Sequence, residues 1–558
     1  MPATILVLRM TPRVRTGTVA ALAGLVALMS ASLLLSAAEE IGANPSNYKP
    51  LVRRLKPGDT LRLSSGTYPG LSITDVNGSD TAWITITGPS EGPPAIIIGR
   101  QNQNAVDVYG SSYVAIENLR IDSRGIPGAF GIAAHGKEEN LVHHIRVEGN
   151  TFVGQGGGQQ TDAISTKTPT WGWVIRYNKI VGAGTGIYLG DSDGTQPFVA
   201  GLIENNLIQD TIGYNLEIKQ QKFLPDIDGM PLGPTTTIIR NNVFIKNDQP
   251  SPDGDRPNVL VGAFPATGSG SLNMYEIYGN VFAHNHREAL FQASGRVTLH
   301  DNLFVDGPYA YPAIVFRQHS GSPLKIAYVY HNTVYTSDHG IYFGSRAMLA
   351  DAVVGNLVFA QKPITGQIMR QADNLTESAE NAPRHVNRPS FDLNSMNFYP
   401  LEGKCSGAAI DLSGFAGDSD YASDFNGRSK VGAGGAVIFR GAYAGAGSNP
   451  GWQIQAGIKS PRPPSPAAAP VLVWISPPTV PAGRNTTVTL TGAGFSADAT
   501  VTVGGAGVSL IKSNVTSPTQ IAATLSVAAG SAGARDVTVI QQSGRSNSLK
   551  LAAAPARK

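Results

Sequence analysis

Residues 175–181 read IRYNKIV, residues 203–209 read IENNLIQ and residues 239–245 read IRNNVFI. In each copy a short β-branched run leads to an asparagine, and a second apolar run follows it. The same frame surrounds nine asparagines: Asn118, Asn150, Asn178, Asn206, Asn242, Asn280, Asn302, Asn332 and Asn356. By subtraction, their spacings are 32, 28, 28, 36, 38, 22, 30 and 24 residues. Self-similarity at a period of about 20–50 residues indicates a repeat architecture.

Each unit contains a third short apolar run after the pair that flanks the asparagine, as in Gly186–Leu189. Alternation with a period of two, bounded by Gly and Asn, predicts strands. No stretch beyond the N-terminus has a sustained helical period, so a helical solenoid is excluded. Three short strands per repeat predict an all-β fold, a right-handed parallel β-helix.

The asparagines have a structural role in such a coil. Asparagine tolerates the left-handed backbone conformation of a sharp corner. Stacked at a spacing of about 4.8 Å, its side-chain amides can hydrogen-bond along the stack. We therefore expect these residues to form corners rather than ligand contacts.

The first 38 residues have the features of a signal peptide. Arg9, Arg13 and Arg15 precede an apolar run from Val19 to Leu35, and small residues follow at 36–38. The run is also long enough for an uncleaved membrane anchor. With cleavage, we expect a secreted, periplasmic or cell-surface protein without a membrane segment.

The composition of the 558 residues agrees with an exported all-β protein. Charged residues make up 15% and glycine accounts for 64 positions. The net charge of +3 is too small to indicate a nucleic-acid partner. Cys405 is the single cysteine, so an intrachain disulfide and a cysteine-rich metal site are both excluded. We expect Cys405 to be buried.

The chain divides into a β-helix at 39–455, a proline-rich linker at 456–470 and a second domain at 471–552. The phrases KPGDTL (56–61), GTY (66–68) and WITITGP (83–89) resemble the first coil of pectate-lyase-like β-helix proteins, including alginate and chondroitin lyases. DFNGR (424–428) and GAY (441–443) match the exit of that group. The resemblance implies a carbohydrate-acting protein with a polysaccharide as its partner.

The C-terminal domain resembles an IPT/TIG domain, an immunoglobulin-like sandwich. The resemblance rests on ISPP (475–478), GAGF (492–495) and DVTV (536–539). Short strands with glycine turns at regular spacing predict a sandwich on their own. The resemblance implies a spacer or a module that contacts other surface proteins.

Aligning the third runs places Ile132, Ile164, Ile187, Ile218, Phe316 and Ile341 toward the interior. Their alternating neighbours then point outward. This outward set contains His135, Ser165, Lys167, Tyr188, Glu217, Lys219, Gln292, Arg317 and Tyr342. Asp162, Asp191 and Asp193 fall at strand ends or in the following turns. We expect one polar strip on the outer face.

A lyase acting on a uronate needs a group that neutralises the carboxylate, a base and an acid. The candidate catalytic residues are Lys219, Glu217, His135, Lys167 and Arg317. Glu217-Ile218-Lys219 resembles the Glu/Lys strand of alginate and chondroitin lyases. The family's arginine on the next coil is absent, because Asn258–Gly262 stands there and Arg317 comes three coils later.

Residues 220–237 and 247–258 are insertions rich in Pro and Asp. Insertions in repeats often build the binding wall. The predicted substrate-binding residues are Tyr188, Tyr342, Gln292, Asp162, Asp253 and Arg256. Calcium is the one cofactor considered, with Asp191 and Asp193 as its ligands, although calcium needs more oxygens than these two supply.

The sequence is consistent with two functions. The first is cleavage of an acidic polysaccharide by β-elimination. The second is non-catalytic binding of glycans or proteins along the solenoid, because a Glu–Lys pair on a strand is often only a solvated surface pair.

Overall fold

The computed structural model describes residues 38–555, except 137–140, 286, 308–310, 320, 433, 460–469, 497, 518 and 542–543. The predicted signal peptide, apart from Ala38, and most of the predicted linker therefore lie outside the described residues. Within the described part of the chain, no helix has the length and apolar character needed to cross a membrane.

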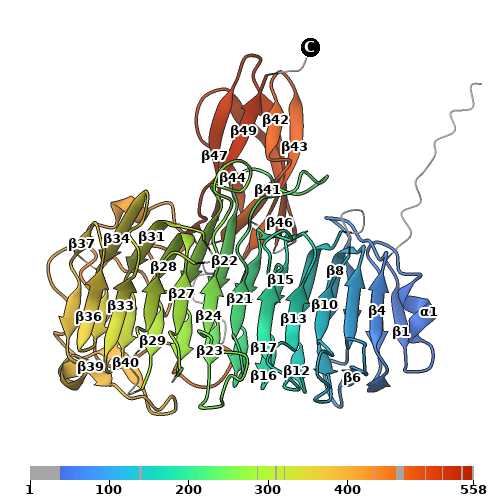
Figure 1. The fold of residues 1–558 in the computed structure, drawn as a ribbon. Coiled ribbons are helices and arrows are strands. Elements are labelled where there is room, and N and C mark those ends of the chain that lie inside the picture. The colour runs from blue at the N-terminus through green and yellow to red at the C-terminus, as the bar shows by residue number, and fades with distance from the viewer. Residues whose placement is uncertain are drawn as a thin grey trace, which may run out of the picture. The chain divides into compact units, whose positions relative to one another are not determined.

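Three long parallel sheets carry most of the chain, and each successive coil adds one strand to each sheet (Figure 1). Sheet A consists of β1 (Glu40–Ala43), β2 (Thr60–Leu63), β5 (Ile84–Thr87), β8 (Ser112–Glu117), β11 (His143–Glu148), β15 (Val174–Arg176), β19 (Leu202–Glu204), β22 (Thr236–Arg240), β25 (Met274–Tyr278), β28 (Gly295–His300), β31 (Leu324–Tyr330), β34 (Ala350–Val354) and β37 (Gln371–Ala372). Sheet B consists of β3 (Gly66–Tyr68), β6 (Ala95–Ile98), β9 (Leu119–Asp122), β12 (Thr151–Val153), β16 (Lys179–Val181), β20 (Leu207–Gln209), β23 (Val243–Ile245), β26 (Val281–Ala283), β29 (Leu303–Val305), β32 (Thr333–Tyr335), β35 (Leu357–Phe359) and β38 (Leu375–Glu377). Sheet C consists of β4 (Leu71–Thr74), β7 (Val106–Tyr109), β10 (Ile132–Ala134), β13 (Asp162–Thr166), β17 (Thr185–Leu189), β21 (Leu216–Ile218), β24 (Val259–Val261), β27 (Phe291–Ala293), β30 (Ile314–Phe316), β33 (His339–Phe343) and β36 (Lys362–Gly366). This topology confirms the predicted right-handed parallel β-helix.

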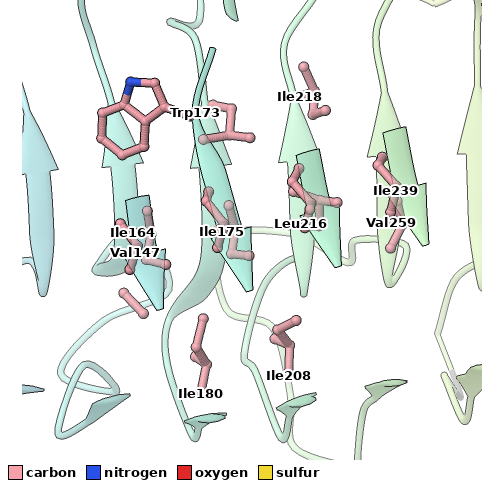
Figure 2. Close-up of a cluster of buried hydrophobic side chains, with 14 of the residues drawn as sticks. Val147, Ile164, Trp173, Ile175, Ile180, Ile208, Leu216, Ile218, Ile239 and Val259 are labelled. Carbon is pink, nitrogen blue, oxygen red and sulfur yellow. The ribbon is translucent and has the colours of Figure 1, made fainter. Parts of the chain in front are cut away.

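Inward side chains stack in rows because adjacent coils pair in register. Ile164 pairs with Ile187, which pairs with Leu216, which pairs with Val259. Figure 2 shows this part of the core, where branched aliphatic side chains from all three sheets fill the interior. Each such side chain is fully buried and contributes roughly 1.5–3 kcal/mol.

A buried asparagine ladder joins the coils at the corner between sheets A and B. The Oδ1 of Asn242 accepts hydrogen bonds from the backbone N–H and the Nδ2 of Asn206, at 3.0 and 2.9 Å. The Nδ2 of Asn242 donates to Oδ1 of Asn280 at 3.0 Å and to the Ile203 carbonyl at 2.9 Å. The same pattern repeats from Asn150 to Asn374, so the predicted stacking of amides is confirmed.

Two details of the asparagine prediction were wrong. The left-handed residue is the one before each ladder asparagine, for example Asn205 (φ 53°) and Asn241 (φ 56°). Asn118 itself is left-handed (φ 55°) and occupies that preceding position, and Leu119 donates its backbone N–H to Asn150. The ladder therefore begins one coil later than expected.

The first coil is covered by a short helix, α1 (Tyr48–Val52), whose Tyr48 and Val52 are buried. This helix was not predicted from the sequence, because five residues are too few to show a helical period. At the other end the last coil closes with β38.

Residues 379–459, here called the return segment, pack along the outside of the solenoid. This segment contains η1 (Ala379–Arg384), β39 (Val386–Arg388) paired with β40 (Asn397–Pro400), and η2 (Ser413–Phe415). Its buried side chains contact the outer faces of sheet B and sheet A. Cys405 is among them at 2% exposure, as predicted, and burial raises the pKa of its thiol to about 12. The apolar contacts of the described return segment therefore cover sheets A and B.

Two mainly antiparallel sheets form the C-terminal domain, in which β42 and β49 are the parallel pair. One contains β41 (Val471–Ser476), β43 (Asn485–Ala493), β46 (Gln520–Val527) and β45 (Val508–Ser517). The other contains β42 (Thr479–Pro481), β49 (Leu549–Ala554), β47 (Gly533–Gln541) and β44 (Thr500–Val503), with β48 (Gly544–Arg545) beside β47. A separate core lies between them, which confirms the predicted immunoglobulin-like sandwich.

Carboxyl groups lie buried where the return segment crosses sheet A. Glu276 accepts the Ser419 backbone N–H at 3.0 Å, and Tyr330 donates to Asp418 at 3.2 Å. Burial, together with the charge of Asp420, raises the pKa of Glu276 to about 7. Protonation of Glu276 therefore favours the attached return segment.

Replacing Asn242 by Ala should lower the free energy of unfolding by about 2–4 kcal/mol, because buried partners on both neighbouring coils lose their hydrogen bonds. Chemical denaturation of the full chain measures this. The control is Asn118→Gly, which keeps a left-handed residue and should cost less than about 1 kcal/mol. Equal losses in both variants would contradict a stabilising ladder.

Stability should also depend on the protonation of Glu276. The unfolded carboxyl ionises near 4.5 and the folded one near 7, so the free energy of unfolding should fall as pH rises through this window. Glu276→Gln should remove on the order of 1–3 kcal/mol of that fall. Thermal unfolding at pH 5 and pH 8 tests this, with exposed Glu91→Gln as control. An unchanged pH dependence in Glu276→Gln would rule out the effect.

Candidate functional site

The outer face of sheet C carries two columns of side chains. The first runs through Ser165, Tyr188, Glu217, Leu260, Gln292, Val315 and Tyr342, which pair in that order on successive coils. The second follows two residues later and contains His135, Lys167, Lys219 and Arg317. The predicted outward strip is therefore present. All six residues predicted to point inward are buried in the core. Their alignment between coils was shifted by two residues at Ile218 and Phe316, because Leu216 and Ile314 pair with the row of Ile187.

The first column forms the floor of this face. Glu217 is 2% exposed and Gln292 is 3% exposed, although both point away from the core. In the second column, Lys219 contacts the carboxyl of Glu217, and Arg317 contacts the amide of Gln292. Lys167 and Arg317 remain exposed, so polar floor groups lie beneath a row of cations.

Glu217 and Lys219 form an ion pair at this face, with Nζ and Oε1 2.8 Å apart. Burial raises the pKa of Glu217, and the ammonium of Lys219 opposes that shift. The side chain of Lys219 crosses Gly190 on the preceding coil, where a Cβ atom would lie 3.3 Å from the Cβ of Lys219. This pair is shielded from solvent and differs from an open surface pair.

Tyr188 lies between two lysines of the flanking coils. The Nζ atoms of Lys167 and Lys219 are 5.5 and 5.6 Å from the centre of its ring. Its hydroxyl is 2.7 Å from the Ser192 hydroxyl. Burial raises the pKa of Tyr188 to about 12, so the phenol keeps its proton at neutral pH.

Asp162 joins this group from the start of β13. Its side chain is 3% exposed, and burial raises its pKa to about 7, against the opposing charge of Lys167. The negative charge of Glu217 contributes to this raised pKa. Asp162 therefore stands within electrostatic range of the Glu217 pair; its predicted role in substrate binding stays a prediction.

The insertion at 247–258 contributes one of its two predicted residues. The guanidinium of Arg256 is 5.7 Å from the ring of Tyr214, and its charge opposes the raised pKa of Glu217. Asp253 has an exposed side chain, and its backbone N–H donates to Gln159 at 2.8 Å. The structure brings Arg256 to the site and gives Asp253 a backbone role in anchoring the insertion.

His135 lies at the end of the polar strip that is nearer to the first coil. It pairs with Asp107, which was not predicted from the sequence. Its Nε2 is 3.0 Å from Oδ1 of Asp107 on the neighbouring strand β7. Their hydrogen bond raises the pKa of His135. The alternation of VDVY (106–109) could have shown that Asp107 points outward.

The two predicted calcium ligands, Asp191 and Asp193, accept hydrogen bonds within a turn. Asp191 accepts the N–H groups of Thr195 and Gln196, each at 2.9 Å, and Asp193 accepts that of Thr195 at 2.8 Å. Among the described residues, no cluster of three His, Cys, Asp or Glu side chains is arranged to hold a metal ion. We therefore assign Asp191 and Asp193 to the turn after β17, which carries Ser192 to Tyr188.

Tyr214 was also missed. It precedes Asn215 in the turn before β21, and its hydroxyl stabilises ionised Glu217. Turn residues have no strand alternation, so no sequence signal marks Tyr214 as facing this site.

Comparison with known proteins identifies the C-terminal domain. Residues 470–552 match the IPT/TIG domain model, so the chain carries an IPT/TIG domain. No curated protein sequence matches the chain.

Solved structures with a related architecture include the PL6 family alginate lyase AlyGC, at 13% identity and a TM-score of 0.38, covering 65% of this chain. A GH136 lacto-N-biosidase from Eubacterium ramulus matches at 11% identity and a TM-score of 0.31, covering 58%. The chain spans about 55% and 63% of those two proteins. At these TM-scores the likeness carries no argument about activity, so the functional argument rests on the residues of sheet C.

The Asp107 carboxylate should hold the pKa of His135 above its usual value. In Asp107→Asn the pKa of His135 should fall, because the charge that favours the imidazolium is removed. NMR titration of the imidazole ring measures it, with exposed Asp75→Asn as control. A His135 titration that is identical in Asp107→Asn and the unaltered protein would contradict the pair.

Proposed function

We propose that the outer face of sheet C binds an acidic polysaccharide and cleaves it by β-elimination. One observation carries the proposal: the ammonium groups of Lys167 and Lys219 flank Tyr188 within 5.6 Å of its ring, beside the buried carboxyl of Glu217. This arrangement supplies cations, a proton donor and a candidate base on one face.

The proposed base is Lys219. The ammonium must first lose a proton, and Glu217 at 2.8 Å can accept it, since burial raises the pKa of that carboxyl. The neutral amine then removes the proton next to the sugar carboxylate, while Lys167 stabilises the charge that develops on that carboxylate.

The proposed acid is Tyr188. The electron pair released at the deprotonated carbon forms a carbon–carbon double bond, and the bond to the leaving oxygen breaks. That oxygen takes a proton from the phenol of Tyr188, which is protonated at neutral pH because its pKa is raised to about 12. One chain product then carries an unsaturated uronate.

A second function is favoured by the same ion pair. Lys219 is 16% exposed and held by Glu217, which suits an ammonium that binds an anion permanently rather than one that exchanges protons. In this alternative the face binds the polysaccharide without cleaving it. Both proposals include export to the periplasm, cell surface or medium. Both also include contact of the IPT/TIG domain with surface proteins.

Incubation with alginate, pectate and chondroitin sulfate should produce the ultraviolet absorbance of an unsaturated uronate with at least one of them. Lys219→Gln should lower the rate by about 10²–10⁴-fold, because the base is lost. The control is Lys179→Gln, which removes an exposed lysine of sheet B and should leave the rate unchanged.

Full activity in Lys219→Gln would exclude Lys219 as the base. No absorbance change with any of the three polymers, from protein with intact far-ultraviolet circular dichroism, would favour the non-catalytic alternative.

A further inference from the structure

Arg317 occupies an isolated position in the second column of sheet C. Its backbone N–H donates to Ala293 on the preceding strand, and the next coil has Gly344 at the equivalent position. Ser294, on the preceding coil, is fully buried. The exposed guanidinium therefore has no long neighbour in its own column on the adjacent coils.

The guanidinium of Arg317 points toward the first column of side chains on the outer face of sheet C. When the amide of Gln292 is oriented with its oxygen toward Arg317, this oxygen accepts hydrogen bonds from Nη2 of Arg317 at 2.7 Å and from Nε at 3.0 Å. Gln292 is 3% exposed, so a buried amide fixes the orientation of the cation. No described carboxylate forms an ion pair with Arg317, whereas Lys219 is already paired with Glu217. A guanidinium has five N–H donors, and those remaining can receive an anion.

An aromatic side chain stands beside this cation. Tyr342 is 37% exposed and lies on the adjacent strand β33. A Cβ atom on Gly344 would lie 3.1 Å from Cε1 of Tyr342 and 3.4 Å from the Cβ of Arg317. The glycine thus lets the ring and the arginine stem approach each other. Exposed aromatic rings bind the apolar faces of sugars, and an arginine fork matches a carboxylate or sulfate.

The surroundings of His319 are also electropositive. Burial lowers the pKa of His319, and the charges of Arg317 and Lys219 lower it further. The pKa of His319 therefore responds to both cations. The strands that carry Lys219 and Arg317 are three coils apart, which is roughly 14 Å at the spacing of a parallel sheet. An anion bound between them would be favoured by this field.

We propose that Arg317, Gln292 and Tyr342 form a subsite for an anionic sugar residue, separate from the Glu217 and Lys219 pair. Arg317 binds the carboxylate or sulfate, Gln292 orients the guanidinium, and Tyr342 packs against the sugar ring. A polymer that occupies both places lies across the strands of sheet C, along the stacking direction of the coils. This inference rests on the proposed acidic substrate, but it assigns Arg317 to binding and not to catalysis.

The test is calorimetric binding of alginate and pectate hexasaccharides to the full chain, beside the same sugars with their carboxylates reduced to alcohols. Arg317→Gln should weaken binding of at least one acidic hexasaccharide by about tenfold and leave the neutral form unaffected. Tyr342→Ala should weaken both forms. Arg120→Gln, which changes an arginine of sheet B with a side chain 41% exposed, should match the unaltered protein.

Each outcome decides the subsite independently of cleavage. Loss of acidic binding in Arg317→Gln without any unsaturated product supports the subsite and removes the lyase proposal. Where product does form, Arg317→Gln should raise KM and leave kcat unchanged. Unchanged binding in Arg317→Gln, equal loss of acidic and neutral sugars, or no binding by the unaltered protein would each overturn the subsite.

Discussion

The asparagine ladder is the constraint on which the rest of this structure depends. From Asn150 to Asn356 each ladder amide bonds to the coil before it and to the coil after it, and this part of the column is buried, so its polar groups have no alternative partner in water. A shift of one residue in any coil would leave these polar groups without hydrogen-bond partners. It would also move the side chains of the shifted strands to the opposite face of their sheets. Spacings of up to 38 residues between successive ladder positions are tolerated because the insertions leave the corner unchanged.

Register at that corner places the chemistry of sheet C. Tyr188, Lys219 and Arg317 are far apart in the sequence, yet fixed coil stacking holds them along one face. The return segment packs its apolar side chains on sheets A and B. Burial of Glu217 and Gln292 at the floor is the physical consequence of long side chains lying over short strands, and it makes their contacts with Lys219 and Arg317 stronger than those of open surface pairs.

The fold and the outward strip could be predicted because both follow from period-two alternation around a repeated asparagine. Asn118 was misassigned because two adjacent positions at this corner, the left-handed one and the ladder one, both accept asparagine. Ile218 and Phe316 were shifted because a displacement of two residues keeps every side chain on the same face. The pairing of Arg317 with Gln292 could not be inferred, since it depends on the direction of a flexible side chain. Tyr214 and the helix α1 lie outside the strand pattern. Burial of Glu276 requires knowledge of the return segment, which has no repeat.

The distribution of charge distinguishes two parts of this face. The Glu217 carboxylate neutralises the ammonium of Lys219 within the protein. A ligand anion at this place would therefore compete with Glu217 for Lys219. At Arg317 the partner is a neutral amide, and the positive charge is left uncompensated. A ligand anion therefore gains more at Arg317, whereas proton transfer is more plausible chemically where Glu217, Lys219 and Tyr188 meet. Under the proposed function, binding and reaction would be separated along the solenoid. That separation suits an extended polymer better than a small molecule, because only a polymer contacts both places at once.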